Sequence, residues 1–290
     1  MSVGLFAPAK VNLTLRVGPP GPDGRHPLDS LVVFTRTCGD SLQLEDSHEL
    51  SLNIDGPFAD ALTAGEDNLI VRAAQILRDH AGINKGAKIV LTKALPIASG
   101  IGGGSADAAA ALIGLNQLWG INASRQTLQD LGAALGADVP ACVVGQALRM
   151  TGTGETIEAI PPLPALGIVL VNPLVPCPTG SVYDQYDRLG SFADTDMPPL
   201  PLIGSVASLC DYVRATPNDL EVAAIAFVPL IGEVLAAIAA TPNALLTRMS
   251  GSGATCFGLY ASYEEAVVAA RWIKNSLASF PIWVEADEIN

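Results

Sequence analysis

The stretch that decides the fold is Leu95-Pro-Ile-Ala-Ser-Gly-Ile-Gly-Gly-Gly-Ser105, and the alanine-rich run Ala106–Trp119 follows it directly. The run has the helix propensity and apolar content of a deeply packed helix, and Lys88–Thr92 ahead of the stretch is predicted to be a strand. The order is therefore strand, glycine loop and helix. A glycine loop that opens a helix lets backbone N–H groups surround an anion at the positive end of the helix, so we expect it to bind phosphate.

Two familiar phosphate motifs do not fit this loop. The Lys-Ser/Thr ending of a Walker loop is absent, and Ser105 occupies the third glycine position of the dinucleotide pattern. The first half of the chain also lacks repeated strand–helix units, which excludes a dinucleotide-dependent oxidoreductase. A glycine-rich turn that simply packs on a sheet stays open as the structural alternative.

Alternating residues mark the N-terminal side of the loop. Leu5–Val17 is predicted to be a half-buried strand, with Lys10 and Asn12 on one face. These two side chains lie about 6.6 Å apart along a strand, a spacing that suits two contacts to one ligand. The ordinary alternative for Lys10 is a solvated charge. Further short strands are expected at Leu31–Thr37, Ser41–Glu45 and Glu49–Ile54.

Helical patterns flank the alanine-rich run. Asn68–Ala81 has helical spacing, and a second helix is predicted from Arg125, capped by Ser124, to Leu135. Asp138 stands at the start of a shorter helix, where its ordinary role would be that of an N-cap.

The stiff segment Pro161–Pro164 gives the expected border between two domains, 1–160 and 161–290. The elements expected beyond it are a strand at Gly167–Asn172, a proline-rich loop at 190–201, a helix at Val222–Ala240 broken by Pro229, a strand at Thr255–Ala261, a helix from the capping box Ser262–Glu265 to Leu277, and a strand at Ile282–Ala286.

Composition narrows the class of protein. With 290 residues, 49% hydrophobic, the chain can build real cores, and no apolar run approaches the ~20 residues of a membrane span. The net charge of −13 repels nucleic acid and anionic membranes. We see no secretion signal, so a cytoplasmic protein is expected.

The cysteines and lysines complete the inventory of chemical groups. The five cysteines form no Cys-x-x-Cys pair and are interpreted as buried free thiols. Three of the five lysines, Lys85, Lys88 and Lys93, precede the glycine loop, where an anion site would need positive charge. A solvated strand edge is the alternative for Lys85 and Lys88.

Three segments occur together in the order and at the separations of one kinase family: Pro8-Ala-Lys-Val-Asn12, Leu95 to Ala106, and Met249-Ser-Gly-Ser-Gly-Ala254. On these motifs the chain resembles the GHMP family of small-molecule kinases over nearly its whole length. Asp23-Gly-Arg-His26 and Leu135-Gly-Ala-Asp138-Val-Pro140 are similar to the branch whose substrate carries a diphosphocytidyl group. The resemblance implies an α+β fold of two domains, with mixed and antiparallel sheets, helices packed on one face, and the active site in the cleft between the domains.

The resemblance also implies an activity and the residues that carry it. ATP would phosphorylate the 2-hydroxyl of diphosphocytidyl methylerythritol in isoprenoid precursor biosynthesis. Asp138 matches the catalytic aspartate that accepts the hydroxyl proton, and Lys10 matches the lysine that neutralises and orients this region. Asn12 and His26 match residues that hold the diphosphocytidyl group and the cytosine. The positions implied for ATP are Asn68 and Lys93 at the adenosine end, and Pro96, Gly100, Ile101, Gly102, Gly103, Gly104, Ser105 and Ala106 around the phosphates.

Further implications concern the pocket and the metal. The family usually has a tyrosine where this chain has Arg25, which would stack on the cytosine opposite an aromatic, here Tyr183. A planar guanidinium can also stack on a base. Gly251 and Gly253 are expected at the substrate. Mg²⁺ should accompany ATP, with Ser105 placed to touch it, and no carboxylate is identified as a metal ligand.

Two alternative functions stay open. One is another kinase of the family, acting on mevalonate, phosphomevalonate, homoserine or a sugar. The other is a non-catalytic nucleotide-binding regulator on the same scaffold, although the presence of both Lys10 and Asp138 argues against it. In each case we expect a small-molecule partner and a monomer or homodimer.

Overall fold

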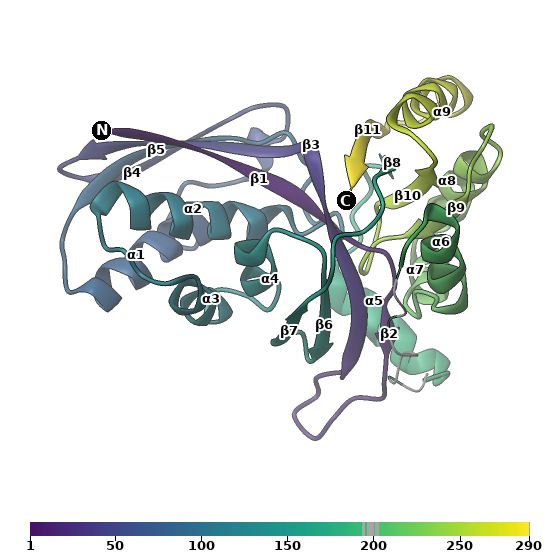
Figure 1. The fold of residues 1–290 in the computed structure, drawn as a ribbon, viewed down its shortest axis with the longest axis horizontal. Helices are drawn as coiled ribbons and strands as arrows, with labels where there is room; N and C mark the ends of the chain where they lie inside the picture. The colour runs from purple at the N-terminus through teal and green to yellow at the C-terminus, as the bar shows by residue number, and fades with distance from the viewer. Residues whose placement is uncertain (193–194, 196–199, 201–202, 290) are drawn as a thin grey trace. The chain divides into compact units, whose positions relative to one another are not determined.

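The computed structural model describes residues 1–192, 195, 200 and 203–289 (Figure 1). The chain forms two compact units. The first unit consists of Met1–Ala9, Cys38–Ile97 and Gly102–Gly145, and the second of Lys10–Thr37, Ala98–Ile101 and Gln146–Asn290. We expected one border near residue 160. Instead the chain passes between the units at several points, and the last of these follows Gly145.

The first unit joins strands to a group of helices. Its elements, two of them shared with the second unit, are β1 (Ser2–Asn12), β3 (Leu28–Ser47), β4 (Leu50–Asp55), η1 (Ala59–Ala61), α1 (Leu69–Ala81), β5 (Gly86–Thr92), α2 (Gly103–Trp119), α3 (Arg125–Ala133) and α4 (Val139–Val144). Strand β5 pairs antiparallel with the second part of β3 and parallel with β4. Figure 1 shows α1 and α2 side by side along these strands.

Small residues let α2 approach the strands of this unit closely. A Cβ added at Gly114 would lie 2.9 Å from side-chain carbons of both Leu44 and Leu5. Ala108, Ala109 and Ala111 are buried on the same helix. The alanine-rich composition of α2 therefore serves close packing.

The second unit contains the remaining elements: β2 (Arg16–Val17), β6 (Leu148–Gly152), β7 (Thr156–Ala159), β8 (Leu166–Asn172), α5 (Thr179–Leu189), α6 (Val206–Ala215), α7 (Glu221–Phe227), α8 (Leu230–Ala239), β9 (Leu246–Met249), β10 (Cys256–Tyr260), α9 (Tyr263–Ser276) and β11 (Trp283–Ile289). Strands β11, β8, β10 and β9 pair antiparallel in that order. Helices α8 and α9 pack on these strands, and every residue of β8 and β10 is buried.

Several expected elements are confirmed. Helices α1 and α3 lie where the spacing placed them, and Ser124 caps α3 by accepting from Thr127 N. The helical run after Val222 is interrupted at Pro229, giving α7 and α8. All five cysteines are free and buried, as interpreted. Mixed and antiparallel pairing with packed helices confirms the α+β class.

Strand lengths differ from the expectation. The two strands expected at Leu31–Thr37 and Ser41–Glu45 form one continuous strand, β3. Gly39, which looks like a break in the sequence, is needed because a Cβ there would lie 2.4 Å from the carbonyl oxygen of Ala7. The strand expected over Leu5–Val17 is instead divided into β1 and β2.

Three smaller expectations have mixed outcomes. Helix α2 begins at Gly103, so the last glycines of the loop are helical. In α9, Ser262 Oγ accepts from Glu265 N, but the Glu265 carboxylate accepts from Ala261 N, so the capping box is half formed. Most of the loop expected at 190–201 lies outside the described residues.

No helix in the described part of the chain is long and apolar enough to cross a membrane.

Candidate active site

The start of α2 in the first unit is built to receive an anion. Gly102, the N-cap, has a left-handed backbone with φ of 65°, and no side chain caps this end of the helix. The first-turn residues Gly103 and Ser105 are half-buried, and Gly104 is exposed. The N–H groups of a first helical turn have no partner within the helix, and the helix dipole makes this end positive. The geometry therefore suits a phosphate group.

The first half of the glycine loop belongs to the second unit and is tied down by its backbone. Ser99 O accepts from Thr255 N at 3.0 Å, Gly100 O accepts from Ser250 Oγ at 3.0 Å, and Ile101 O accepts from Lys10 N at 2.9 Å. Of the remaining loop positions, Pro96, Ile101 and Ala106 are buried. These contacts bring the N-terminal motif and the Met249–Ala254 motif to the loop.

Gly100 is required where the two glycine-containing loops meet. A Cβ on Gly100 would lie 2.6 Å from the carbonyl oxygens of both Gly253 and Ser250, and φ at Gly100 is +75°. Gly251 has φ of +56°, and a Cβ there would lie 2.8 Å from Gly100 O. Backbone therefore packs directly on backbone at this point.

Lys10 and Asn12 emerge from β1 beside these loops. Both side chains are buried, with residue exposures of 4% and 5%. Asn12 N donates to Ser250 Oγ at 3.1 Å, and Asn12 Nδ2 donates to Ser30 Oγ at 2.7 Å. The structure thus brings Lys10 and Asn12 together with Gly100, Gly251 and Gly253 in one unit.

An aromatic group forms around His26. The rings of His26 and Tyr183 lie 4.9 Å apart, and those of His26 and Phe192 lie 6.5 Å apart. His26 Nδ1 is 2.8 Å from Gly18 O, and Nε2 is 3.4 Å from an oxygen of Asp187. The structure therefore places His26 and Tyr183, each expected separately at the cytosine, side by side. Neighbouring Arg25 is exposed, and its backbone N donates to Asp23 Oδ1.

Asp138 lies in the first unit immediately before α4. It occupies the N-cap position, but its side chain makes no capping hydrogen bond. The residue is half-buried, whereas Val139 is buried, and a Cβ on Gly132 would lie 2.8 Å from a Val139 methyl group. Packing of Val139, rather than capping by Asp138, fixes the start of this helix.

Lys93 has a role that the sequence did not indicate. Its side chain is 3% exposed, and its ammonium group donates to carboxylates of Asp40 and Asp107. Burial lowers the pKa of Lys93, but the two carboxylates offset this and the pKa is raised. Two buried acids thus take up the ammonium group, and the expected contact of Lys93 with the adenosine end of ATP stays a prediction.

Other polar residues near the loop in sequence also have structural partners. Asn68 caps α1: its Oδ1 accepts from Ile70 N at 2.9 Å, and its Nδ2 donates to Thr63 O. Lys85 Nζ donates to Trp119 O at the end of α2. The Lys85 bond lies at the far end of α2 from the expected anion site. Lys93, in contrast, does reach the start of α2, because a Cβ on Gly103 would lie 3.1 Å from Lys93 Nζ.

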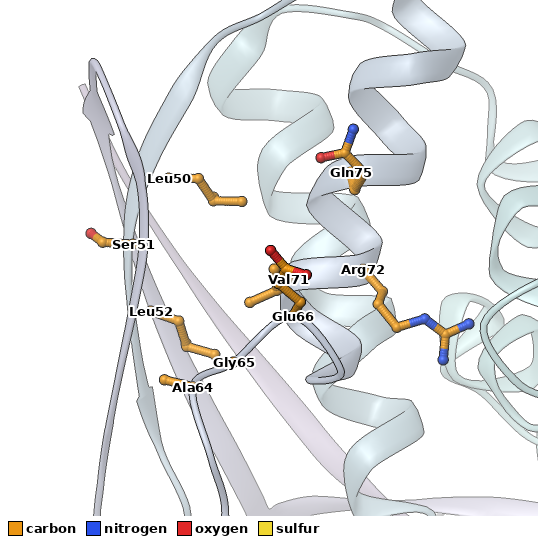
Figure 2. A pocket seen from close by; sticks show the side chains of 9 residues that line it. All are labelled: Leu50, Ser51, Leu52, Ala64, Gly65, Glu66, Val71, Arg72 and Gln75. Carbon is orange, nitrogen blue, oxygen red and sulfur yellow. The ribbon is translucent and has the colours of Figure 1, made fainter.

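A cavity of about 760 Å³ lies between β4 and α1 in the first unit. Figure 2 shows the side chains that line it. The cavity is lined by Leu50, Ser51, Leu52, Ala64, Gly65, Glu66, Val71, Arg72 and Gln75. None of the residues expected at the active site lines it.

Sequence reasoning missed the residues that hold the third motif. Asn218 Nδ2 donates to Met249 O and Gly251 O, and a Glu221 carboxylate oxygen accepts from Met249 N. The only available signal was a polar run, Pro217 to Glu221, before an apolar helical segment.

Family models match both parts of the chain. The model for the GHMP kinases N terminal domain matches residues 68–146, and the model for the GHMP kinases C terminal domain matches residues 201–277. The first match contains the glycine loop, α2 and Asp138. The chain belongs to the GHMP kinase family, and it is an ATP-dependent small-molecule kinase.

Comparison with individual proteins identifies the branch of the family. The chain is 49% identical over 285 residues to the 4-diphosphocytidyl-2-C-methyl-D-erythritol kinase of Paramagnetospirillum magneticum, covering 97% of this chain and 96% of the relative. The Hyphomonas neptunium enzyme of the same name is 47% identical, with 92% of each chain covered. The branch is therefore that of the 4-diphosphocytidyl-2-C-methyl-D-erythritol kinases.

Solved structures agree with this placement. A crystal structure of a 4-(cytidine 5'-diphospho)-2C-methyl-D-erythritol kinase superposes with a TM-score of 0.80 at 32% identity, covering 99% of both chains. A homoserine kinase from Cytophaga hutchinsonii superposes with a TM-score of 0.72 at 22% identity, covering 99% of this chain and 94% of that one, which shows a shared fold.

Proposed function

We propose that this chain transfers the γ-phosphoryl group of ATP to the 2-hydroxyl of 4-diphosphocytidyl-2-C-methyl-D-erythritol, a step of isoprenoid precursor biosynthesis. The observation that carries the proposal is the meeting of three remote motifs: Lys10 N bonds to Ile101 O, Asn12 N to Ser250 Oγ, and Ser250 Oγ to Gly100 O. Relatives that match 97% and 92% of this chain carry the name of this activity.

The start of α2 would hold the phosphates of ATP. The uncapped first turn at Gly103 and Gly104 supplies N–H donors, and the dipole of a 17-residue helix favours negative charge there. Because Gly100 has no side chain, the loop backbone can pack directly on the backbone of Ser250 and Gly253.

The acceptor would lie on the second unit. In the proposal, Asn12 holds the diphosphocytidyl group, and the cytosine rests against His26 and Tyr183. Supporting this, the Asn12 amide is oriented by its bond to Ser30 Oγ, and His26 is fixed by Gly18 O. The two aromatic rings are tilted by 46° rather than stacked, so they form adjoining walls.

Phosphoryl transfer depends mainly on alignment of donor and acceptor and on charge balance. We assign to Asp138 the acceptance of the proton of the 2-hydroxyl, and to Lys10 the neutralisation and orientation of the reacting groups.

Mg²⁺ is expected to accompany ATP. No three His, Cys, Asp or Glu side chains among the described residues gather into a metal site. A magnesium ion held chiefly by phosphate oxygens and water, with Ser105 of the first α2 turn as a protein ligand, fits this donor set. When bound, the ion would neutralise phosphate charge. The proposal also places the enzyme in the cytoplasm.

An assay of ADP release tests the substrate. Purified chain is supplied with ATP, Mg²⁺ and one of four acceptors: diphosphocytidyl-methylerythritol, mevalonate, homoserine or galactose. The proposal expects turnover with the first alone, and inhibition of that turnover by CMP. Turnover with another acceptor, or none with the first, would overturn it.

A further inference from the structure

Asn218 occupies a fixed position in the segment between α6 and α7 of the second unit. The residue is 4% exposed. Its backbone neighbours are tied to the chain just after Asn12, because Leu15 N donates to Pro217 O at 3.2 Å and Asp219 N donates to Leu15 O at 2.8 Å. The place of the Asn218 side chain is therefore set by main-chain bonds.

The orientation of the Asn218 amide is also set. Its Oδ1 accepts from Leu220 N at 3.0 Å, which turns Nδ2 toward the third motif. Nδ2 donates to Met249 O at 2.9 Å and to Gly251 O at 2.8 Å. Because a side-chain amide nitrogen has two N–H donors, its whole donor capacity is used on these two carbonyl groups.

Ser250 lies between the two carbonyl groups that Asn218 holds. It is fully buried, its Oγ accepts from Asn12 N at 3.1 Å, and the same Oγ donates to Gly100 O at 3.0 Å. A shift of the Met249–Gly251 backbone would therefore move a hydroxyl that contacts both the β1 motif and the glycine loop.

We propose that Asn218 is a positioning residue for phosphoryl transfer, acting through Met249–Gly251 and Ser250 on Asn12 and Gly100. The inference rests on the proposed function, which places Asn12 at the acceptor and Gly100 beside the phosphates. Asn218 touches neither ligand in this account. Its contribution is to keep two ligand-facing segments in register with each other.

The test compares two substitutions of the same chemical kind. Asn218→Asp keeps the acceptor for Leu220 N but places a carboxylate against two carbonyl oxygens. Asn116→Asp is the control, because Asn116 Nδ2 also donates to a carbonyl, that of Ala123, near the end of α2. Melting temperatures are measured first, and kinetics are run well below the lowest of them.

The proposal expects Asn218→Asp to lower kcat/KM for the acceptor by about tenfold or more and to weaken ATP binding, measured by calorimetry, by about threefold or more. Asn116→Asp should stay within about threefold of the parent in both measurements. A folded Asn218→Asp protein with near-parental kcat/KM and ATP affinity would overturn the proposal, even if its melting temperature falls.

A second variant keeps the test possible if the Asn218→Asp protein does not fold. Asn218→Ala removes both donors without adding charge, and the same losses are expected of it. ATP affinity can be measured without the acceptor, so it tests the positioning role separately from the substrate assignment. If the parent chain does not phosphorylate diphosphocytidyl-methylerythritol, only the substrate assignment fails. Unchanged ATP affinity in both folded Asn218 variants would then overturn the positioning role by itself.

Discussion

The ammonium group of Lys93 lies 2.7 Å from Oδ2 of Asp107, while Oδ1 of the same carboxylate is buried with no hydrogen-bond partner in the described part of the chain. Asp40 holds the other side of the ammonium group and also accepts from the backbone N of Ala94 and Leu95. The ion pair thus links the end of β5 to the first turns of α2, on either side of the glycine loop. Two carboxylates share one cation, which leaves one negative charge in excess when both are ionised.

This arrangement predicts a pH-dependent stability. Burial raises the pKa of Asp107 to about 7. Because the folded pKa lies above the unfolded value, the contribution of this group is present at low pH and is lost as the pH rises through about 7. Asp107→Asn should therefore be more stable than the parent at pH 8, by on the order of 1 kcal/mol, and the difference should shrink toward pH 5.

Urea unfolding at several pH values measures that difference. Asp130→Asn, which changes an exposed aspartate of α3, is the matched control and should follow the parent. A constant difference between Asp107→Asn and the parent from pH 5 to pH 8 would show that Asp107 does not titrate in this range.

The role assigned to Asp138 predicts a defect in turnover rather than in binding. Asp138→Asn keeps the size of the side chain and removes its basicity, so kcat should fall by about 10²–10⁴-fold. Dissociation constants for ATP and for the acceptor should change little, because asparagine keeps the size of the side chain and one of its acceptor oxygens. Near-normal ADP release by a folded variant would rule out this role.

Replacing Arg25 by tyrosine is expected to raise the affinity for the cytidine substrate or to leave it unchanged. It is exposed beside His26, whose ring adjoins Tyr183, so a tyrosine there would add an aromatic surface for a base. Arg25→Tyr should bind the cytidine substrate as well as the parent does or better, as judged by calorimetry. A loss beyond about tenfold, or about 1.4 kcal/mol, would mean that the guanidinium makes a specific contact.

A side chain at position 100 is expected to clash with the neighbouring backbone. A methyl group there would lie 2.6 Å from two carbonyl oxygens, so Gly100→Ala must push Ser250 and Gly253 away. We expect a loss of about tenfold or more in kcat/KM for ATP. Gly232→Ala on α8, where the new Cβ would lie 3.6 Å from an Ile225 methyl group, is the control and should keep parental activity. Equal activities of the two variants would contradict the required close approach.

Much of the fold was predictable because local patterns dominate it. The spacing of apolar residues located α1, and the cap at Ser124 located the start of α3. Pro229 located the break between α7 and α8. The continuity of β3 was not predictable, because it depends on the backbone of Ala7 passing over Gly39, a contact between distant segments.

The candidate site divides in the same way. The resemblance of three motifs predicted that Lys10, Asn12 and Gly100 belong together, and their backbones do meet. The buried partners of Lys93 come from β3 and α2, and no spacing in the sequence links Asp40 to Asp107. The role of Asn218 was not predictable for a related reason, because its hydrogen-bond partners lie about thirty residues further along the chain.

The burial of all five cysteines has a practical consequence for spectroscopy. Burial also raises the pKa of the Cys177, Cys210 and Cys256 thiols, which suppresses their reactive thiolate forms. Maleimide dyes should therefore spare the native thiols and label cysteines introduced by His80→Cys and Lys274→Cys, both at exposed positions. A donor and an acceptor fluorophore at these two positions would then test whether nucleotide binding changes the distance between them.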